Sequence, residues 1–156
     1  MALAAALMSA AARAEILQGI VVEIGEGDTL TLQVGRQRHL IRIAGIDAPE
    51  RLQAWGDQSK TNLSRLASGQ AAVADCSHFD PSGHKVCKVT ANTRDLGLVQ
   101  IQQGMAWWNR QDRLSPQERS AYESAELMAK LRRLGLWGDT HPVPPWLFRK
   151  GAGWPP

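Results

Sequence analysis

The sequence predicts an α+β protein, mainly β, in which five strands and three helices form one domain and a tail rich in proline and tryptophan follows. The chain has 156 residues, a length that suits a single domain. Strand-like alternation of apolar residues comes mostly in the first half, and helix-like spacing mostly in the second. Apolar residues make up 44% and charged residues 21%, which excludes collagen, coiled coil and wholesale disorder.

The first three predicted strands follow one another with short turns and form a meander. They cover residues 19–24, 29–34 and 40–44, separated by segments that contain glycine. Two further strands, over residues 71–78 and 85–91, form a hairpin. Five strands with short connections fit a small, partly open barrel, the OB-fold.

Three helices are predicted, over residues 57–66, 96–103 and 116–134. Asp95 caps the second helix, and Ser115 with Glu118 forms a capping box at the start of the third. Gly135 ends that helix. From His141 onward the density of proline excludes regular helix and central strand, so we expect an extended surface strap. We expect residues 150–156 to be a flexible tail.

The first fourteen residues are small and apolar and end in Ala12-Arg13-Ala14, which is typical of a secretory signal peptide cleaved before Glu15. No Lys or Arg precedes the apolar part, and an alanine-rich helix is the alternative. We therefore assign residues 1–14 to a signal peptide remnant and 15–149 to the folded domain, and expect a periplasmic or secreted location. No apolar run reaches the roughly 20 residues that span a bilayer, so membrane insertion is not expected.

The two cysteines lie on either side of a predicted turn. Asp80-Pro81-Ser82-Gly83 favours a type I turn, and with its centre at Pro81 and Ser82 the two strands place Cys76 opposite Cys87. We expect a disulfide, which an oxidising compartment would allow. The alternatives are two unpaired thiols, or a zinc site with His78 that lacks a fourth ligand.

Acidic side chains cluster around two turns of the predicted meander. Asp28 follows the first strand, and Asp47 and Glu50 follow the third. These turns can lie at the same end of the sheet, which would bring three carboxylates together. Crowded carboxylates repel and need a cation or protons to coexist. Oxygen ligands without His or Cys indicate a hard cation such as Ca²⁺ or Mg²⁺.

Two basic side chains lie near these carboxylates in the sequence. Arg42 enters the acidic loop from the third strand, where it can form an ion pair with Asp47 or Glu50 or bind a phosphate with its planar fork. His84, after the hairpin turn, can donate a proton near neutral pH or be an ordinary exposed histidine.

Read together, these segments resemble the staphylococcal nuclease (thermonuclease) family over residues 18–149. The matching motifs are Gly27-Asp28-Thr29, Ile41-Arg42-Ile43-Ala44-Gly45-Ile46-Asp47-Ala48-Pro49-Glu50, the Asp80-x-x-Gly83 turn, Gly104-Met105-Ala106-Trp107, Tyr122-Glu123-Ser124-Ala125-Glu126, Gly135-Leu136-Trp137 and Pro142-Val143-Pro144-Pro145-Trp146. The last of these looks like the tail of exported bacterial members.

The resemblance implies an OB-fold barrel flanked by three helices and a Ca²⁺-dependent phosphodiesterase, with Mg²⁺ or Mn²⁺ as alternative cations. It implies that Asp28 and Asp47 bind the cation with help from the Ala48 carbonyl. Glu50 would orient or deprotonate the attacking water, and Arg42 would bind the phosphate and stabilise the transition state.

The hairpin departs from the family pattern. The family's turn normally reads D-x-Y-G-R, and its arginine is a second phosphate-binding group. Here Ser82 replaces the tyrosine and His84 the arginine. A histidine cannot bind phosphate bidentately and is mostly neutral near pH 7, although it can act as a general acid. Lys85 is one residue further on, where strand alternation turns it to the other face.

We therefore expect a nuclease that hydrolyses DNA and RNA with little sequence preference, favours single strands and is a monomer. A net charge of +3 agrees with polyanionic partners. The alternative is a binding module for nucleic acid or protein, with catalysis attenuated by His84. A third reading is an interaction protein that uses the tail. The Trp107-Trp108 pair suits base stacking or, more simply, core packing.

Overall fold

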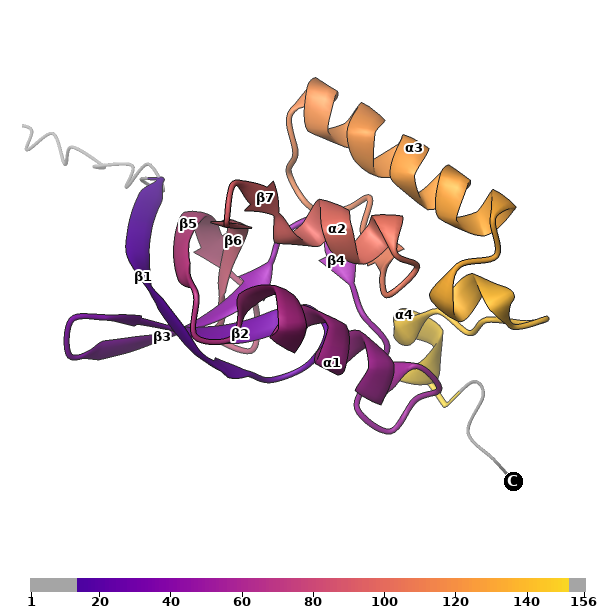
Figure 1. The fold of residues 1–156 in the computed structure, drawn as a ribbon, viewed down its shortest axis with the longest axis horizontal. Helices are drawn as coiled ribbons and strands as arrows, with labels where there is room; N and C mark the ends of the chain where they lie inside the picture. Colours follow the sequence, from indigo (N-terminus) through magenta and orange to yellow (C-terminus); the bar gives the residue numbers. More distant parts are fainter. Residues whose placement is uncertain (1–13, 152–156) are drawn as a thin grey trace, which may run out of the picture.

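The computed structural model describes residues 14–151 (Figure 1). All but the last residue of the predicted signal peptide, and most of the predicted terminal tail, lie outside the described residues. The strands are β1 (Glu15–Ile24), β2 (Thr29–Val34), β3 (Gln37–Ile43), β4 (Ile46–Asp47), β5 (Ala71–Phe79), β6 (Lys85–Ala91), β7 (Arg94–Asp95) and β8 (Trp107–Trp108). The helices are α1 (Gly56–Ala67), α2 (Leu96–Gln102), α3 (Pro116–Leu131), the 3₁₀ turn η1 (Gly135–Gly138) and α4 (Pro145–Phe148).

Five strands form a closed barrel, which confirms the predicted α+β fold with an OB-fold barrel. They follow the order β3-β2-β1-β5-β6, and parallel pairing of β3 with β6 closes the ring. Inward-facing aliphatic side chains such as Val21, Leu32, Ile41 and Val89 are fully buried and fill the interior. The sequence did not predict β4, β7 and β8, because two residues are too few to show an alternating pattern.

The β5–β6 hairpin carries the predicted disulfide. Cys76 is paired with Cys87 in the strand register, and their sulfurs are bonded. The zinc and free-thiol alternatives are therefore wrong. The register shifts between Cys76 and His78, so one extra residue is accommodated before the turn. The Asp80 carboxylate then closes the turn by accepting hydrogen bonds from the backbone N–H groups of Ser82 and His84, both at 2.9 Å.

The three predicted helices are present, with the predicted caps. Asp95 accepts a hydrogen bond from the Leu98 backbone at the start of α2, and the capping box of Ser115 and Glu118 opens α3. The expected end of α3 at residue 134 is wrong, because the helix ends at Leu131 and Arg133 has a left-handed backbone with φ of 53°. None of the helices within residues 14–151 is long and apolar enough to cross a bilayer.

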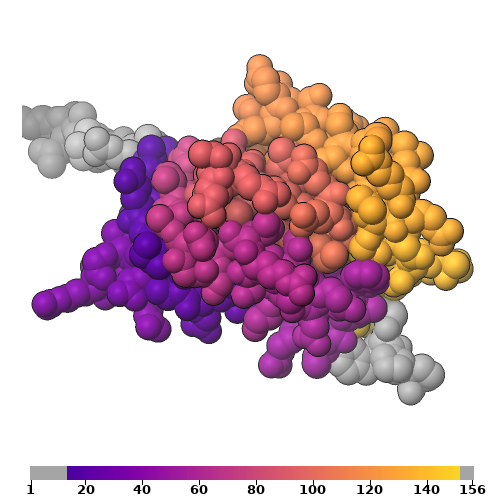
Figure 2. Space-filling view, viewed as in Figure 1, coloured from indigo at the N-terminus to yellow at the C-terminus, as the bar shows by residue number. Residues whose placement is uncertain are grey.

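The proline-rich tail packs against the body of the molecule, as predicted, but it is not extended throughout. One helical turn, α4, forms because Pro144 is extended at the N-cap and Pro145 takes the first helical position, where a missing N–H has no cost. Trp146 packs on buried Trp107 with ring centroids 6.4 Å apart, and Gln53 donates a hydrogen bond to the Val143 carbonyl at 2.5 Å. In the space-filling view the C-terminal third forms one continuous block (Figure 2).

Trp107 and Trp108 are both almost fully buried, so core packing accounts for this pair. Trp107 lies between two other indoles, with its ring centroid 5.2 Å from that of Trp137 on η1. This aromatic cluster joins β8 to the tail. It therefore fixes where the chain beyond α4 meets the barrel.

Candidate active site

One cavity at an end of the barrel brings together every ionisable residue predicted to act in the site. Its volume is about 530 Å³. The lining residues include Asp28, Arg42, Asp47, Glu50 and His84. Strand pairing explains the convergence.

The β2–β3 register sets the start of β2 beside the end of β3. Thr29 is paired with Arg42, and the Ile43 backbone N–H donates to the Asp28 carbonyl at 2.8 Å. Because β4 follows β3 after a two-residue turn, Asp47 comes back to the same end of the barrel. The β5–β6 turn, which carries His84, completes the rim.

Asp28 is buried in this cavity, with 7% of its surface exposed. Its carboxylate accepts a hydrogen bond from the Ala48 backbone N–H at 2.9 Å. Desolvation by burial raises the pKa of Asp28 to about 7, and the negative charges of Asp47 and Glu26 add to the rise against that hydrogen bond. The positive charge of Arg42 lowers the pKa of Asp28, but too little to offset the desolvation.

We predict a pH-dependent stability effect of Asp28→Asn in the absence of cations. The folded pKa of Asp28 lies above its ordinary value of 3.8, so its contribution to stability is complete below about pH 4 and is lost as the pH rises through about 7. The asparagine variant has no such loss. It should match wild type near pH 4 and exceed its free energy of unfolding by roughly 4 kcal/mol at pH 8.

Thermal unfolding of both proteins in EDTA across this range measures the effect. A difference in Tm between the two proteins that does not change with pH would show that burial does not raise the pKa of Asp28. Asp75→Asn, on the exposed side of β5, is the control for loss of an aspartate charge.

Arg42 is held by two acidic residues that are not those considered from the sequence. Its two terminal nitrogens donate to the carboxylate oxygens of Asp112, both at 3.0 Å, and its Nε lies 3.5 Å from Asp80. Burial lowers the pKa of Arg42, but the hydrogen bonds and charge of Asp112 outweigh it and the pKa is raised. The guanidinium is therefore fixed and charged, and a pair with Asp47 or Glu50 is not formed.

Asp112 is a positioning residue that the sequence did not reveal. It lies between β8 and α3, is 8% exposed, and also accepts a hydrogen bond from the Gly45 backbone N–H at 2.8 Å. It thus ties Arg42 to the turn that leads into β4. No local pattern around Asp112 indicates this role, since its partners are about seventy residues away in the chain.

His84 lies on the cavity rim with its ring held by the turn. Its Nδ1 is 3.3 Å from the Asp80 carboxylate, which also contacts Arg42. Asp80 therefore links the histidine to the arginine. Lys85 points away, as alternation predicted, because it pairs with Glu15 and lies 4.9 Å from the centre of the Phe79 ring.

Asp47 and Glu50 are joined by a residue that the sequence did not single out. Arg149, just after α4, donates to both carboxylate oxygens of Asp47 at 2.8 and 3.1 Å and also to Glu50. The hydrogen bonds that Arg149 donates to Asp47, and secondarily to Glu50, raise its pKa above the ordinary value. The predicted cation ligand and the predicted base thus share one guanidinium.

The donor set of the cavity fits a hard divalent cation. Asp28 and Asp47 offer carboxylate oxygens without competing His or Cys ligands, and the raised pKa of Asp28 marks a buried site short of positive charge. Within residues 14–151 no three acidic, histidine or cysteine side chains converge in a ready-made metal cluster. Arg149 already donates to both carboxylate oxygens of Asp47, so this arginine competes with a cation for that ligand.

The sequence profile of the family described as "Staphylococcal nuclease homologue" matches residues 40–139, which hold most of this site. The chain belongs to this family. The resemblance seen in the motifs is thereby confirmed. The segment matched to the staphylococcal nuclease homologues begins within β3 and ends just after η1.

Three curated relatives match over most of their length. "Protein ParB" of Escherichia coli is 33% identical over 159 residues, covering 96% of this chain and 88% of the relative. "Micrococcal nuclease" of Shigella flexneri is 33% identical over 144 residues, covering 86% and 82%. An "Uncharacterized endonuclease" of Haemophilus influenzae is 34% identical over 131 residues, covering 83% and 71%.

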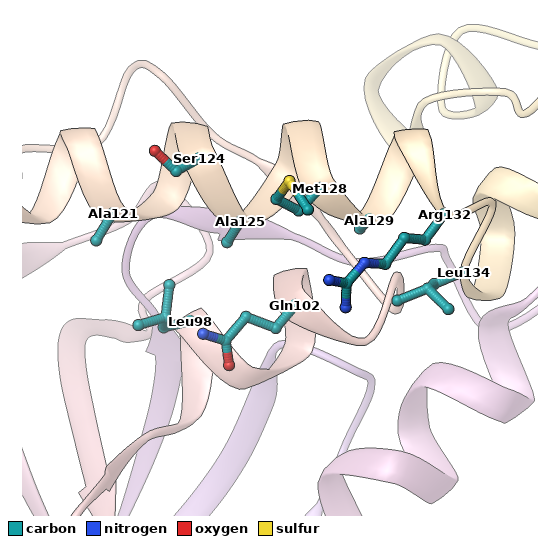
Figure 3. Close-up of a pocket in the computed structure, with 9 residues that line it drawn as sticks. All are labelled: Leu98, Gln102, Ala121, Ser124, Ala125, Met128, Ala129, Arg132 and Leu134. Atoms are coloured by element: carbon teal, nitrogen blue, oxygen red, sulfur yellow. The ribbon is translucent and has the colours of Figure 1, made fainter.

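A second hollow in this staphylococcal nuclease homologue lies between α2 and α3, away from the ionisable cluster (Figure 3). Its volume is about 420 Å³, and its walls are mostly small or aliphatic side chains such as Leu98, Ala125 and Met128. Arg132 reaches into it from the end of α3 (Figure 3). Its lining includes the Ser124 hydroxyl but no carboxylate, histidine or cysteine, and none of its lining residues lines the first cavity.

Proposed function

We propose that this protein is a divalent-cation-dependent nuclease that hydrolyses the phosphodiester bonds of DNA and RNA with little sequence preference. The observation that carries the proposal is the convergence of Asp28, Asp47, Glu50 and Arg42 in one cavity. It combines oxygen ligands, a base and a fixed phosphate-binding group, which phosphodiester hydrolysis requires. The names of two relatives, a micrococcal nuclease and an endonuclease, support the same reaction.

Asp28 and Asp47, with the Ala48 carbonyl, would hold the cation. We propose Ca²⁺, with Mg²⁺ and Mn²⁺ as alternatives, because all the donors are oxygen atoms. When bound, the cation supplies Lewis-acid catalysis and orients the phosphate. Ionised Asp28 is needed for this binding, so cation affinity should rise with pH through the region of the raised pKa.

The remaining groups act on the attacking water, the phosphate and the leaving oxygen. Glu50 orients the water and takes its proton as the water oxygen bonds to phosphorus. Arg42, fixed by Asp112, donates to the phosphate oxygens on which negative charge develops. As the bond from phosphorus to the leaving oxygen breaks, protonated His84 gives that oxygen its proton.

Single strands are the substrate that the site suits best. A hollow of about 360 Å³ adjoins the cavity and shares Asp47, Asn109 and Arg149 with it. Trp146 and Lys150 line this hollow, and Trp146 is 38% exposed. An accessible indole stacks on any base and a lysine follows the backbone, which gives binding without sequence reading.

A panel of equal-length single-stranded DNA, duplex DNA and RNA of mixed sequence, incubated with Ca²⁺, tests this function. We expect all to be cleaved, single strands fastest, at many positions along each strand. Cleavage of one defined sequence only, or of none, would contradict the proposal.

A second function has one observation in its favour. The hairpin position carries His84, so Arg42 is the only permanently charged group that β3 and the hairpin turn give to the cavity. A protein with this site could bind nucleic acid and turn it over slowly. Such a module would show salt-dependent affinity for DNA with little cleavage.

His84→Arg separates the two functions. If His84 is the proton donor, the arginine variant should cleave roughly 10–100-fold more slowly and lose the alkaline fall of its pH–rate profile. If His84 merely weakens the site, the variant should be faster than wild type. An unchanged rate and profile would exclude both roles. His39→Arg, on β3 away from the cavity lining, is the control for the added charge.

We also propose that the protein acts outside the cytoplasm. The Cys76–Cys87 disulfide supports this proposal, because structural disulfides persist in oxidising compartments. Fractionation of cells that express the full chain, with detection of the mature N-terminus, tests it. A protein confined to the cytoplasm and begun at Met1 would contradict it.

A further inference from the structure

Arg149 reaches the candidate active site from a tail that is anchored by other contacts. The tail is held by the Trp146–Trp107 packing, by the Gln53–Val143 hydrogen bond and by α4 itself. The Arg149 backbone N–H donates to the Pro145 carbonyl at 2.9 Å and closes the helical turn. These contacts place the Arg149 side chain at the cavity whether or not it forms ion pairs there.

The ion pairs of Arg149 add little to the stability of this arrangement. Its side chain is 47% exposed, and ion pairs of exposed side chains contribute little to the stability of a fold. An anchored segment does not need them to stay in place. Stability therefore does not explain why the guanidinium lies between Asp47, the predicted cation ligand, and Glu50, the predicted base.

The charges in the cavity indicate a role for Arg149 in binding the substrate. Five carboxylates line it, those of Glu26, Asp28, Asp47, Glu50 and Asp80, against two guanidinium groups. A phosphodiester adds another negative charge, and its transition state a further one. Arg42 already has Asp112 and Asp80 as fixed partners, whereas the Arg149 fork is placed on Asp47, whose oxygens a cation would take.

We propose that Arg149 is a second phosphate-binding catalytic residue, which rests on Asp47 and Glu50 without the cation and turns to the substrate phosphate when the cation takes Asp47. This inference rests on the proposed nuclease function and deepens it. Arginine suits the role because its planar fork binds carboxylate and phosphate with the same bidentate geometry. In this exchange the cation replaces Arg149 on Asp47, the phosphate replaces Asp47 on Arg149, and Glu50 is released to act on the water.

Cation binding tests the first half of the inference without any turnover. We expect Arg149→Gln to bind Ca²⁺ about 10-fold more tightly than wild type in calorimetric titrations, because Asp47 is then free. Arg149→Lys should lie between them. Arg38→Gln, on the β2–β3 hairpin at the far end of the strands from Asp28, removes the same charge and should bind Ca²⁺ as wild type does. Equal Ca²⁺ affinity of Arg149→Gln and wild type would overturn the proposed competition.

Oligonucleotide binding tests the second half. In the presence of Ca²⁺, a short phosphorothioate oligothymidylate, whose backbone is charged, should bind Arg149→Gln about 10- to 100-fold more weakly than wild type, the loss of a charged hydrogen bond. A methylphosphonate oligomer of the same length has a neutral backbone. It should bind both proteins equally. Equal binding of the charged oligomer would overturn the phosphate contact.

Turnover then separates a catalytic arginine from one that only blocks the site. Cleavage by Arg149→Gln at saturating Ca²⁺ should fall by on the order of 10²-fold. A rate equal to or above that of wild type would overturn the inference and show that Arg149 only occupies Asp47. If wild type cleaves no substrate, the proposed function fails, while the two binding comparisons still decide whether Arg149 contacts the cation ligand and the phosphate.

Discussion

Glu50→Gln should lower the rate of DNA cleavage by on the order of 10²–10⁴-fold while Ca²⁺ binding stays close to wild type. Glutamine keeps the shape of the side chain and can still accept hydrogen bonds through its carbonyl oxygen. It cannot take a proton from water. Glu50 lies in the loop after β4, where it lines the cavity and accepts a hydrogen bond from Arg149. The substitution therefore removes a base while the fold is kept.

Single-turnover cleavage and calorimetric Ca²⁺ titration of the same preparations measure both parts. Glu123→Gln, on the exposed side of α3, is the matched control and should cleave as wild type does. A Glu50→Gln protein that keeps the wild-type rate would show that another group deprotonates the water. Loss of Ca²⁺ binding in this variant would instead make Glu50 a cation ligand.

Removal of the disulfide should have the largest destabilising effect. Cys76 and Cys87 are eleven residues apart, and closing a loop of this length stabilises a fold by about 3 kcal/mol. The Cys76→Ala, Cys87→Ala protein should unfold at a Tm roughly 10–15 °C lower. Alanine is preferred to serine because both sulfurs lie in the core, where an unpaired hydroxyl would add its own cost.

Wild type in a reductant strong enough to open the bond should show a similar fall in Tm, and the double variant should not respond to that reductant. A double variant as stable as oxidised wild type would contradict this prediction. Cleavage at a temperature well below both transitions should be nearly unchanged, since neither cysteine lines the cavity.

The parts of the fold that could be predicted from the sequence rest on patterns that are local. The strands of the barrel alternate over several residues, and a turn of known type sets Cys76 opposite Cys87. The convergence of Asp28 with Asp47 and Glu50 also follows from local facts. They lie at turns of one meander, and strand pairing brings such turns to one end.

The unpredicted parts depend on contacts between distant segments. Asp112 reaches Arg42 across 70 residues of sequence, and Arg149 reaches Asp47 across 102. Neither residue lies in a motif that indicates a site, and the composition of the tail around Arg149 predicted only a surface strap. The two-residue strands β4 and β8 exist because they pair with each other, not because either has strand-like alternation.

The tail shows how tertiary packing corrects a local rule. Proline excludes long helix, and the prediction of an extended strap followed from it. A single turn needs only one proline at its first position, and the packing of Trp146 on Trp107 holds that turn in place. This turn brings Arg149 to the cavity. Because an extended strap was predicted instead, Arg149 was not predicted as a residue of the candidate site.

The most direct test of the proposed cation-dependent nuclease activity is a time course of single-stranded DNA cleavage by the purified protein. Cleavage is followed first with Ca²⁺, then with excess EDTA, then with Ca²⁺ restored. The arrangement of Asp28, Asp47, Glu50 and Arg42 predicts cleavage that stops with the chelator and resumes with the cation. Cleavage that continues in EDTA would contradict it. So would the absence of cleavage with Ca²⁺, Mg²⁺ and Mn²⁺ from mildly acidic to alkaline pH.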